Sequence, residues 1–215
     1  MVEALLWDMD GVLVDTAPFH FQAWRALFAS QGKDLSEDEF RRTFGLRNDD
    51  ILRMNLGEMP PERLRELADR KEELFREAIN GRIVPLPGAV DLVRRLRAKS
   101  VKQAVVSSAP RQNVETILEA LALAAAFDAL VTEQDVQRGK PDPQGYLLAA
   151  ERLDVPPAKC IVIEDAPAGV EAAKRAGMRC IGLAAARRPE DLAASDLVVA
   201  TLEDDAVYSF LGIPR

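Results

Sequence analysis

The chain has 215 residues, 48% hydrophobic and 29% charged, which suits one sizeable globular domain or a domain with a smaller insert. Its formal net charge of −7 argues against nucleic acid or an anionic membrane as a main partner, since both favour basic surfaces. No apolar run approaches the roughly 20 residues of a membrane span, and no basic-then-apolar leader opens the chain. We expect a cytoplasmic monomer in which the two cysteines, Cys160 and Cys180, are reduced and buried.

The first predicted element is a buried strand over residues 2–7, followed directly by Asp8, Asp10 and Gly11. In open α/β sheets, ligands bind beyond the carboxyl ends of the strands. One carboxylate there could attack phosphorus, the other could handle a proton, and together they could hold a divalent cation. Asp-x-Asp-Gly also occurs in turns and calcium loops, but no further calcium ligands follow here at the required spacing.

Residues 17 to about 82 carry only helical patterns. An amphipathic helix over residues 19–31 places His20 and Trp24 on one face. Ser36 and Glu39 have the spacing of a capping box, which predicts a second helix. A turn at residues 45–48 leads into a short helix to about residue 56, and two prolines precede a long charged helix over residues 62–80.

The pattern changes at residues 83–88, a connector with two prolines and a glycine. Strands are then expected at 101–107, 129–132, 160–164, 180–183 and 197–199, alternating with helices at 89–99, 111–122, 143–153, 169–176 and 204–211. Such alternation predicts an α/β fold with right-handed crossovers and a mostly parallel sheet. We therefore predict a core domain of residues 1–15 and 83–215, interrupted by a small all-helical domain of residues 16–82.

Polar side chains follow four of the predicted strands, at the edge where carboxyl ends meet. Phosphoryl transfer needs a carboxylate nucleophile, hard oxygen ligands for a metal ion, and a hydroxyl and an ammonium to hold phosphoryl oxygens. The chain offers these groups in order as Asp8 and Asp10, Ser107 and Ser108, Lys140, and Glu164 and Asp165.

Each of these residues also has a plain alternative when taken alone. Ser107 could cap the end of its strand, Lys140 could be a solvated lysine, and Asp165 could cap the helix that contains Gly169. The four groups together favour a phosphoryl-transfer site over these alternatives.

The motifs resemble those of the haloacid dehalogenase superfamily of phosphohydrolases, and within it the β-phosphoglucomutase-like group. The resemblance covers the whole chain and implies a Rossmann-like parallel core with an inserted helical cap. The motifs are Asp8-Met9-Asp10-Gly11-Val12, Val105-Val106-Ser107-Ser108, Lys140 within Gly139-Lys140-Pro141-Asp142-Pro143, and Ile163-Glu164-Asp165 followed by Gly169.

The resemblance assigns roles to the acidic residues. Asp8 would be the nucleophile and form an aspartyl-phosphate, while Asp10 would protonate the leaving oxygen and then help to activate water. A Mg²⁺ ion would be held by Asp8, the backbone carbonyl of Asp10 and Asp165, with Glu164 as a further acidic group of the metal site. Dehalogenases lack an acid at the position of Asp10, so the resemblance points to a phosphatase or phosphomutase.

The resemblance also assigns the cationic and hydroxyl groups. Ser107, Ser108 and Lys140 would bind the phosphoryl group, and Lys140 would also restrain the Asp8 carboxylate. Residues 11–16 and 83–88 would be hinge segments that let the cap close and exclude bulk water.

The chain's one histidine, His20, has two interpretations. It could be a buried, hydrogen-bonded histidine packed against a core aromatic, or, by the resemblance, a cap residue that couples substrate to Asp10. Trp24 lies one turn further along the same helix. Arg47 and Asn48 belong to the turn at residues 45–48, which would be the substrate-facing loop of the cap or else an ordinary helix–helix turn.

Two departures from the mutases weaken a mutase assignment. The mutases carry an arginine where Asn48 aligns and a lysine on the fourth cap helix where Glu77 aligns, and these cations hold the second phosphate of a bisphosphate intermediate. Arg47 and Arg76 are adjacent, but a neighbouring helical position points about 100° away. The sequence therefore predicts a Mg²⁺-dependent phosphatase acting on a small phosphorylated metabolite, a sugar phosphate. β-Phosphoglucomutase and a non-catalytic phosphometabolite-binding protein are the alternatives.

Overall fold

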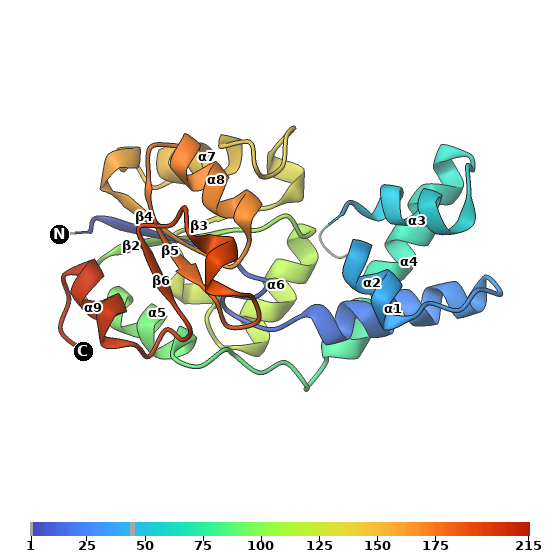
Figure 1. Cartoon of the computed structure of the whole chain (residues 1–215), viewed down its shortest axis with the longest axis horizontal. Coiled ribbons are helices and arrows are strands. Elements are labelled where there is room, and N and C mark those ends of the chain that lie inside the picture. Colours follow the sequence, from blue (N-terminus) through green and yellow to red (C-terminus); the bar gives the residue numbers. More distant parts are fainter. Residues whose placement is uncertain (1, 44–45) are drawn as a thin grey trace. The chain divides into compact units, whose positions relative to one another are not determined.

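The computed structural model describes residues 2–43 and 46–215, and the chain divides into two compact units (Figure 1). The core unit consists of Met1–Asp15 and Ile83–Arg215, and the inserted unit is Thr16–Arg82. Gly45, the first residue of the predicted substrate-facing turn, lies outside the described residues.

A sheet of six parallel strands, counted over the described residues, forms the centre of the core unit, in the order β3-β2-β1-β4-β5-β6. β1 is wholly buried because strands flank it on both sides and helices cover the sheet. All the predicted strands are present with slightly different ends: β1 begins at Ala4 rather than at residue 2. The strands are β1 (Ala4–Trp7), β2 (Lys102–Val106), β3 (Ala129–Val131), β4 (Cys160–Glu164), β5 (Arg179–Leu183) and β6 (Leu197–Val199).

Helices cover both faces of this sheet (Figure 1). α7 (Gln144–Arg152) and α8 (Pro167–Arg175) pack on one face, where their small apolar side chains meet alternate residues of the strands. On the other face Gln103 of β2 donates to the carbonyl of Val93 in α5 (Ala89–Ala98) at 3.0 Å. α6 (Arg111–Ala120) and α9 (Asp205–Leu211) lie on the same side as α5.

The change of face follows from the strand order. The chain builds β2 and β3 on one side of β1 and then returns to place β4 on the other side. Right-handed crossovers then require α7 and α8 to lie on the face opposite α5 and α6. The order reverses between β1 and β4, and in open α/β sheets ligands bind beyond the carboxyl ends of the strands at such a point.

Single-turn 3₁₀ helices also occur in the core unit, and the sequence did not predict them. One turn is too short for its apolar periodicity to be recognised. They are η1 (Ala124–Ala126), η2 (Glu133–Asp135), η3 (Pro157–Lys159) and η4 (Pro189–Leu192).

Within its described residues, the regular elements of the inserted unit are all helices, as predicted. Its apolar centre includes Trp24 and Phe28, with neighbours from the other helices of the unit. The predicted capping box is confirmed, since Glu39 Oε2 accepts from the backbone N–H of Ser36 at 2.9 Å while Ser36 Oγ accepts from that of Glu39 at 3.3 Å. The helices are α1 (Ala17–Ser30), α2 (Glu37–Thr43), α3 (Asn48–Leu56) and α4 (Pro61–Ile79).

The two connectors between the units run side by side within the core unit. Val14 forms an isolated antiparallel bridge with Pro85, and the backbone N–H of Leu86 donates to the carbonyl of Leu13 at 2.9 Å. This pairing is compatible with the predicted hinge, whose motion stays a prediction. Across the part of the chain that the structure covers, every helix falls short of the length and apolarity that a membrane crossing requires.

Candidate active site

The two acidic motifs meet at the carboxyl edge of the sheet because β1 and β4 are neighbours in register. Trp7 pairs with Ile163, and the backbone N–H of Asp8 donates to the Ile163 carbonyl at 3.0 Å. Asp8 therefore leaves β1 beside Glu164, the last residue of β4, and Asp165 follows at once.

Three carboxylates converge at this point. One oxygen each from Asp8, Glu164 and Asp165 lies within 4.8 Å of the others, and Asp8 and Glu164 are buried. Clustered carboxylate oxygens are the ligands that Mg²⁺ and other hard divalent cations prefer. The donor set therefore fits the predicted metal ion.

Lys140 stands between two of these carboxylates. Its Nζ donates to Asp8 Oδ1 at 2.5 Å, to Glu164 Oε1 at 2.6 Å and to the backbone carbonyl of Val106 at 3.2 Å. An ammonium group has three N–H donors, so these three contacts use all of them. The ammonium is thus held at a defined point against the predicted nucleophile.

The Glu164 carboxylate, like the Lys140 ammonium, uses all of its hydrogen-bonding capacity. Its Oε1 accepts from Lys140 and from the phenolic hydroxyl of Tyr146 at 2.8 Å, and its Oε2 accepts from the backbone N–H groups of Asp165 and Ala166, both at 3.0 Å. A carboxylate offers about four acceptor sites. Glu164 would have to release one of these donors to bind a metal ion directly.

Two glycines permit these close approaches. A Cβ on Gly11 would lie 2.3 Å from Asp165 Oδ2, and a Cβ on Gly169 would lie 1.7 Å from Glu164 Oε1. Both separations are impossible for real atoms, so only glycine allows the first acidic loop and α8 to contact the acidic residues after β4. Gly11 also has φ +85°, a conformation that glycine adopts without strain.

Burial and charge shift the pKa values of the cluster. Burial raises the pKa of Asp8 well above its ordinary value, although the neighbouring Lys140 lowers it. Burial and the Glu164 carboxylate raise the pKa of Asp165 to about 6. Burial alone would lower the pKa of Lys140, but the carboxylates of Asp8 and Glu164 outweigh it and raise that pKa. The cluster carries more negative charge than Lys140 balances, and a bound cation would relieve this excess.

The remaining predicted core residues lie at the same edge. Asp10 is partly buried in the loop after β1, and its charge contributes to the raised pKa values of Asp8 and Asp165. Ser107 is buried directly after β2, and its Oγ accepts from the backbone N–H of Ala109 at 3.1 Å, so it also fits the strand-end cap alternative. Ser108 is exposed beside it.

The alternative role of Asp165 as a helix cap is wrong. The N-cap position of α8 is Ala166, and the backbone N–H of Ala166 donates to Glu164 Oε2 rather than to Asp165. Asp165 instead faces Arg187, whose Nε lies 3.7 Å from its Oδ2. The loop after β5 therefore brings a cation to the acidic cluster, which the sequence alone did not reveal.

Two predicted residues of the inserted unit, His20 and Asn48, belong to one contact network. Lys71 Nζ lies 2.8 Å from His20 Nδ1 and donates to Glu72 Oε1 at 2.8 Å, and Asn48 Nδ2 donates to the same oxygen at 2.7 Å. Because an ammonium only donates, His20 Nδ1 is the acceptor and the neutral ring carries its proton on Nε2. His20 also stacks on Phe75 with ring centroids 4.0 Å apart. His20 is therefore partly buried, hydrogen-bonded and stacked on a core aromatic, and its coupling of substrate to Asp10 stays a prediction.

Trp24 and Arg47 occupy different settings in this unit. Trp24 is buried, with the Lys71 ammonium 5.3 Å from its ring centroid, so it joins the network around His20. Arg47 is exposed at the N-cap position of α3.

The resemblance to the mutases placed their α4 lysine at Glu77. Glu77 is exposed and pairs with Arg70 at 3.2 Å. The basic side chain that α4 presents to His20 is Lys71, one and a half turns earlier. The departures at Glu77 and Asn48 stay sequence-based arguments against a mutase.

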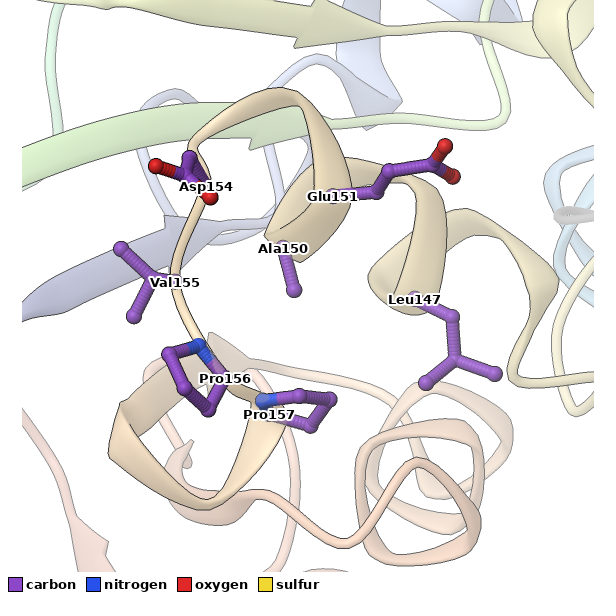
Figure 2. A pocket seen from close by; sticks show the side chains of 7 residues that line it. All are labelled: Leu147, Ala150, Glu151, Asp154, Val155, Pro156 and Pro157. Carbon is purple, nitrogen blue, oxygen red and sulfur yellow. The ribbon is translucent and has the colours of Figure 1, made fainter.

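A surface pocket of about 420 Å³ lies elsewhere on the core unit (Figure 2). Pro156 and Pro157 in its wall precede β4, so the pocket lies at the amino end of that strand, opposite the acidic cluster. It is lined by Leu147, Ala150, Glu151, Asp154, Val155, Pro156 and Pro157, and it is separate from the candidate active site.

Comparison with known proteins decides the family. Residues 2–177 match the family model of the haloacid dehalogenase-like hydrolases. The chain belongs to this family. The predicted superfamily and fold class are thereby confirmed, and so is the predicted enzyme class, a phosphomonoester hydrolase of the haloacid dehalogenase-like family.

Individual relatives of this haloacid dehalogenase-like hydrolase include phosphatases and a mutase. It is 33% identical over 204 residues to the validoxylamine A 7′-phosphate phosphatase of Streptomyces hygroscopicus subsp. limoneus, covering 95% of this chain and 96% of the relative. It is 36% identical over 181 residues to the phosphorylated carbohydrates phosphatase of Thermotoga maritima, covering 84% of each. The crystal structure of β-phosphoglucomutase from Clostridium difficile superimposes with a TM-score of 0.85 at 27% identity, covering 99% of this chain and 98% of that one.

Proposed function

We propose that this protein is a Mg²⁺-dependent phosphatase that hydrolyses a small phosphorylated metabolite, a sugar phosphate, through an aspartyl-phosphate. The observation that carries the proposal is the contact of Lys140 with Asp8 inside a cluster of carboxylates at the switch point of the sheet. Relatives named for phosphatase activity on phosphorylated carbohydrates and on validoxylamine A 7′-phosphate support the substrate class.

In the first step, an oxygen of Asp8 attacks phosphorus and the bond from phosphorus to the leaving oxygen breaks. Asp10, in the loop after β1, donates its proton to that oxygen as the alcohol departs. Lys140 donates to Asp8 before the reaction, and it would exchange one of its three contacts for a phosphoryl oxygen. Ser107 would bind another phosphoryl oxygen.

In the second step, Asp10 takes a proton from water as the water oxygen attacks the phosphoaspartate. The bond between phosphorus and the Asp8 oxygen breaks, which releases inorganic phosphate and restores both aspartates. Asp8, Asp165 and the Asp10 carbonyl would hold the Mg²⁺ ion, which offsets the charge of the phosphoryl group when it is bound. Glu164 would keep Lys140 in place.

The inserted unit would supply recognition of the leaving group, through His20, Trp24, Arg47 and Asn48. Phosphatase activity is favoured over mutase activity because Glu72 lies against Lys71 and Asn48, so a carboxylate already balances the lysine of this network. A second phosphate would meet that carboxylate as well as the ammonium. The contact of Lys71 with His20 keeps β-phosphoglucomutase as the second candidate.

The test is a phosphate-release screen over sugar phosphates and other small phosphates, with and without Mg²⁺. We expect Mg²⁺-dependent release of one phosphate for each substrate molecule consumed, and we expect Asp8→Asn to abolish this release. Asp154→Asn is the matched control, because Asp154 is exposed, lies at the opposite edge of the sheet and has φ 50°, which asparagine tolerates. Bisphosphate-dependent interconversion of glucose 1- and 6-phosphates without net release would instead establish the mutase. Unchanged hydrolysis in Asp8→Asn would refute the mechanism.

A further inference from the structure

Tyr146 places the one phenolic hydroxyl of α7 inside the apolar layer between that helix and the sheet. The residue is 1% exposed, and its neighbours in this layer include Ala149, Ala150 and Val170. A phenylalanine would fill the same space without burying a polar group, and burying a hydroxyl costs free energy unless it finds a partner. The partner here is Glu164 Oε1, at 2.8 Å.

The same side chain also contacts the cation that Glu164 holds. Lys140 Nζ lies 5.3 Å from the centroid of the Tyr146 ring, on the attractive face of the aromatic system. Tyr146 thus touches both members of the Lys140–Glu164 pair, the ammonium through its ring and the carboxylate through its hydroxyl. Among the described residues, its hydroxyl makes no hydrogen bond to Asp8.

We propose that Tyr146 is a positioning residue of the phosphatase site. By donating to Glu164 Oε1, its hydroxyl weakens the hold of that carboxylate on Lys140 and so determines how closely the Lys140 ammonium approaches Asp8. This inference rests on the proposed function, since it assigns a task to the contact of Lys140 with the nucleophile. Two donors share Glu164 Oε1, Lys140 at 2.6 Å and Tyr146 at 2.8 Å, so the strength of one contact depends on the other.

Removing the hydroxyl leaves Lys140 as the one side-chain donor to Glu164 Oε1. The carboxylate then attracts the ammonium more strongly, or turns toward the metal site, and either change moves the ammonium from the point where it meets Asp8 and a phosphoryl oxygen. Groups that orient the residues of a metal site typically change activity by about 10- to 100-fold when they are removed. The loss should appear in phosphate affinity and in turnover together, because Lys140 acts in both.

The experiment compares Tyr146→Phe with Tyr208→Phe, which removes the hydroxyl of the chain's other tyrosine, a buried residue of α9. With p-nitrophenyl phosphate and Mg²⁺, we expect Tyr146→Phe to lower kcat/KM by at least about tenfold, and Tyr208→Phe to retain wild-type activity. In the presence of Mg²⁺, inorganic phosphate should raise the melting temperature of Tyr146→Phe less than that of the wild type. Equal phosphate-induced shifts and equal kcat/KM in the two single variants would overturn the proposal.

A double-mutant cycle with Glu164→Gln separates positioning from a general loss of packing. If Tyr146 acts through Glu164, Tyr146→Phe should change kcat/KM little in the Glu164→Gln background. The same fold-loss in both backgrounds would overturn the proposed route. If the wild type releases no phosphate but still binds inorganic phosphate, the proposed function fails while the phosphate-binding comparison still decides the role of Tyr146. If it does neither, both proposals fall.

Discussion

Lys140 Nζ lies 2.5 Å from Asp8 Oδ1, although 132 positions separate the two residues in the chain. The contact joins the loop after β1 to the loop before α7, and the same ammonium reaches Glu164 at the end of β4. One partly buried cation therefore joins three segments that the sheet brings to a single edge. Several consequences of this arrangement can be measured.

Lys140→Gln should abolish turnover and destabilise the core unit. The substitution leaves two buried carboxylates without their cation, and breaking a buried ion pair costs about 3 kcal/mol in the free energy of unfolding. Urea denaturation at pH 7 measures that loss, with Lys99→Gln, at an exposed helix end, as the control. Adding Asp8→Asn to Lys140→Gln should recover part of the stability, and a fully additive loss would show that the two side chains are not coupled.

Gly169→Ala should inactivate the enzyme although it improves helix propensity. On an unobstructed helix, alanine in place of glycine stabilises by about 1 kcal/mol. Here the new Cβ would lie 1.7 Å from Glu164 Oε1, so Glu164 must move and Lys140 loses its hydrogen bond to that carboxylate. A lower unfolding free energy together with lost phosphate release would agree with this account. A stabilised, active variant would show that Glu164 is not held against α8.

Mg²⁺ should stabilise the folded protein, and a chelator should abolish activity. A ligand present at 100 times its Kd contributes about 2.7 kcal/mol to the unfolding free energy, so the melting temperature should rise as Mg²⁺ is added. Asp165→Asn should lose most of this rise, because it removes one of the converging carboxylates. Asp154→Asn should keep it. A rise of equal size in both variants would exclude Asp165 as a ligand.

The one histidine gives a pH-dependent stability that a single NMR signal can follow. Burial and the Lys71 ammonium lower the pKa of His20 well below its ordinary value of about 6.5. The unfolded chain therefore binds a proton at a higher pH than the folded chain does, and His20 makes folding less favourable as pH falls below about 6.5. This loss of stability stops increasing once the pH lies below the pKa of His20 in the folded protein, because both the folded and the unfolded chain then carry the proton.

The imidazole signal should accordingly stay in its neutral form well below pH 6.5. Comparing the acid dependence of unfolding in the wild type and in His20→Gln isolates this contribution, because all other titrating groups are shared. The wild type should lose more stability than the variant between neutral and mildly acid pH. An imidazole that titrates at its ordinary pKa would contradict the buried contact with Lys71.

Patterns local in the chain were sufficient to locate the strands, the inserted helices and the four polar motifs. They sufficed because the carboxyl ends of parallel strands share one edge, so residues that follow β1, β2 and β4 must meet once the sheet forms. The capping box at Ser36 could also be predicted from the sequence, because all of its hydrogen bonds lie within four residues.

Only the tertiary structure decided how the polar groups share their hydrogen bonds. The motif made Glu164 a metal-site acid, but its carboxylate accepts from four donors: the backbone N–H groups of the two residues that follow it, Lys140, and Tyr146 of α7, which belongs to no motif. In the inserted unit, the α4 lysine that meets His20 is Lys71, because two helices must pack before their facing positions are defined. Spacing along a chain determines which side chains reach an edge or a face. Which donor meets which acceptor there depends on packing between segments that sequence spacing does not describe.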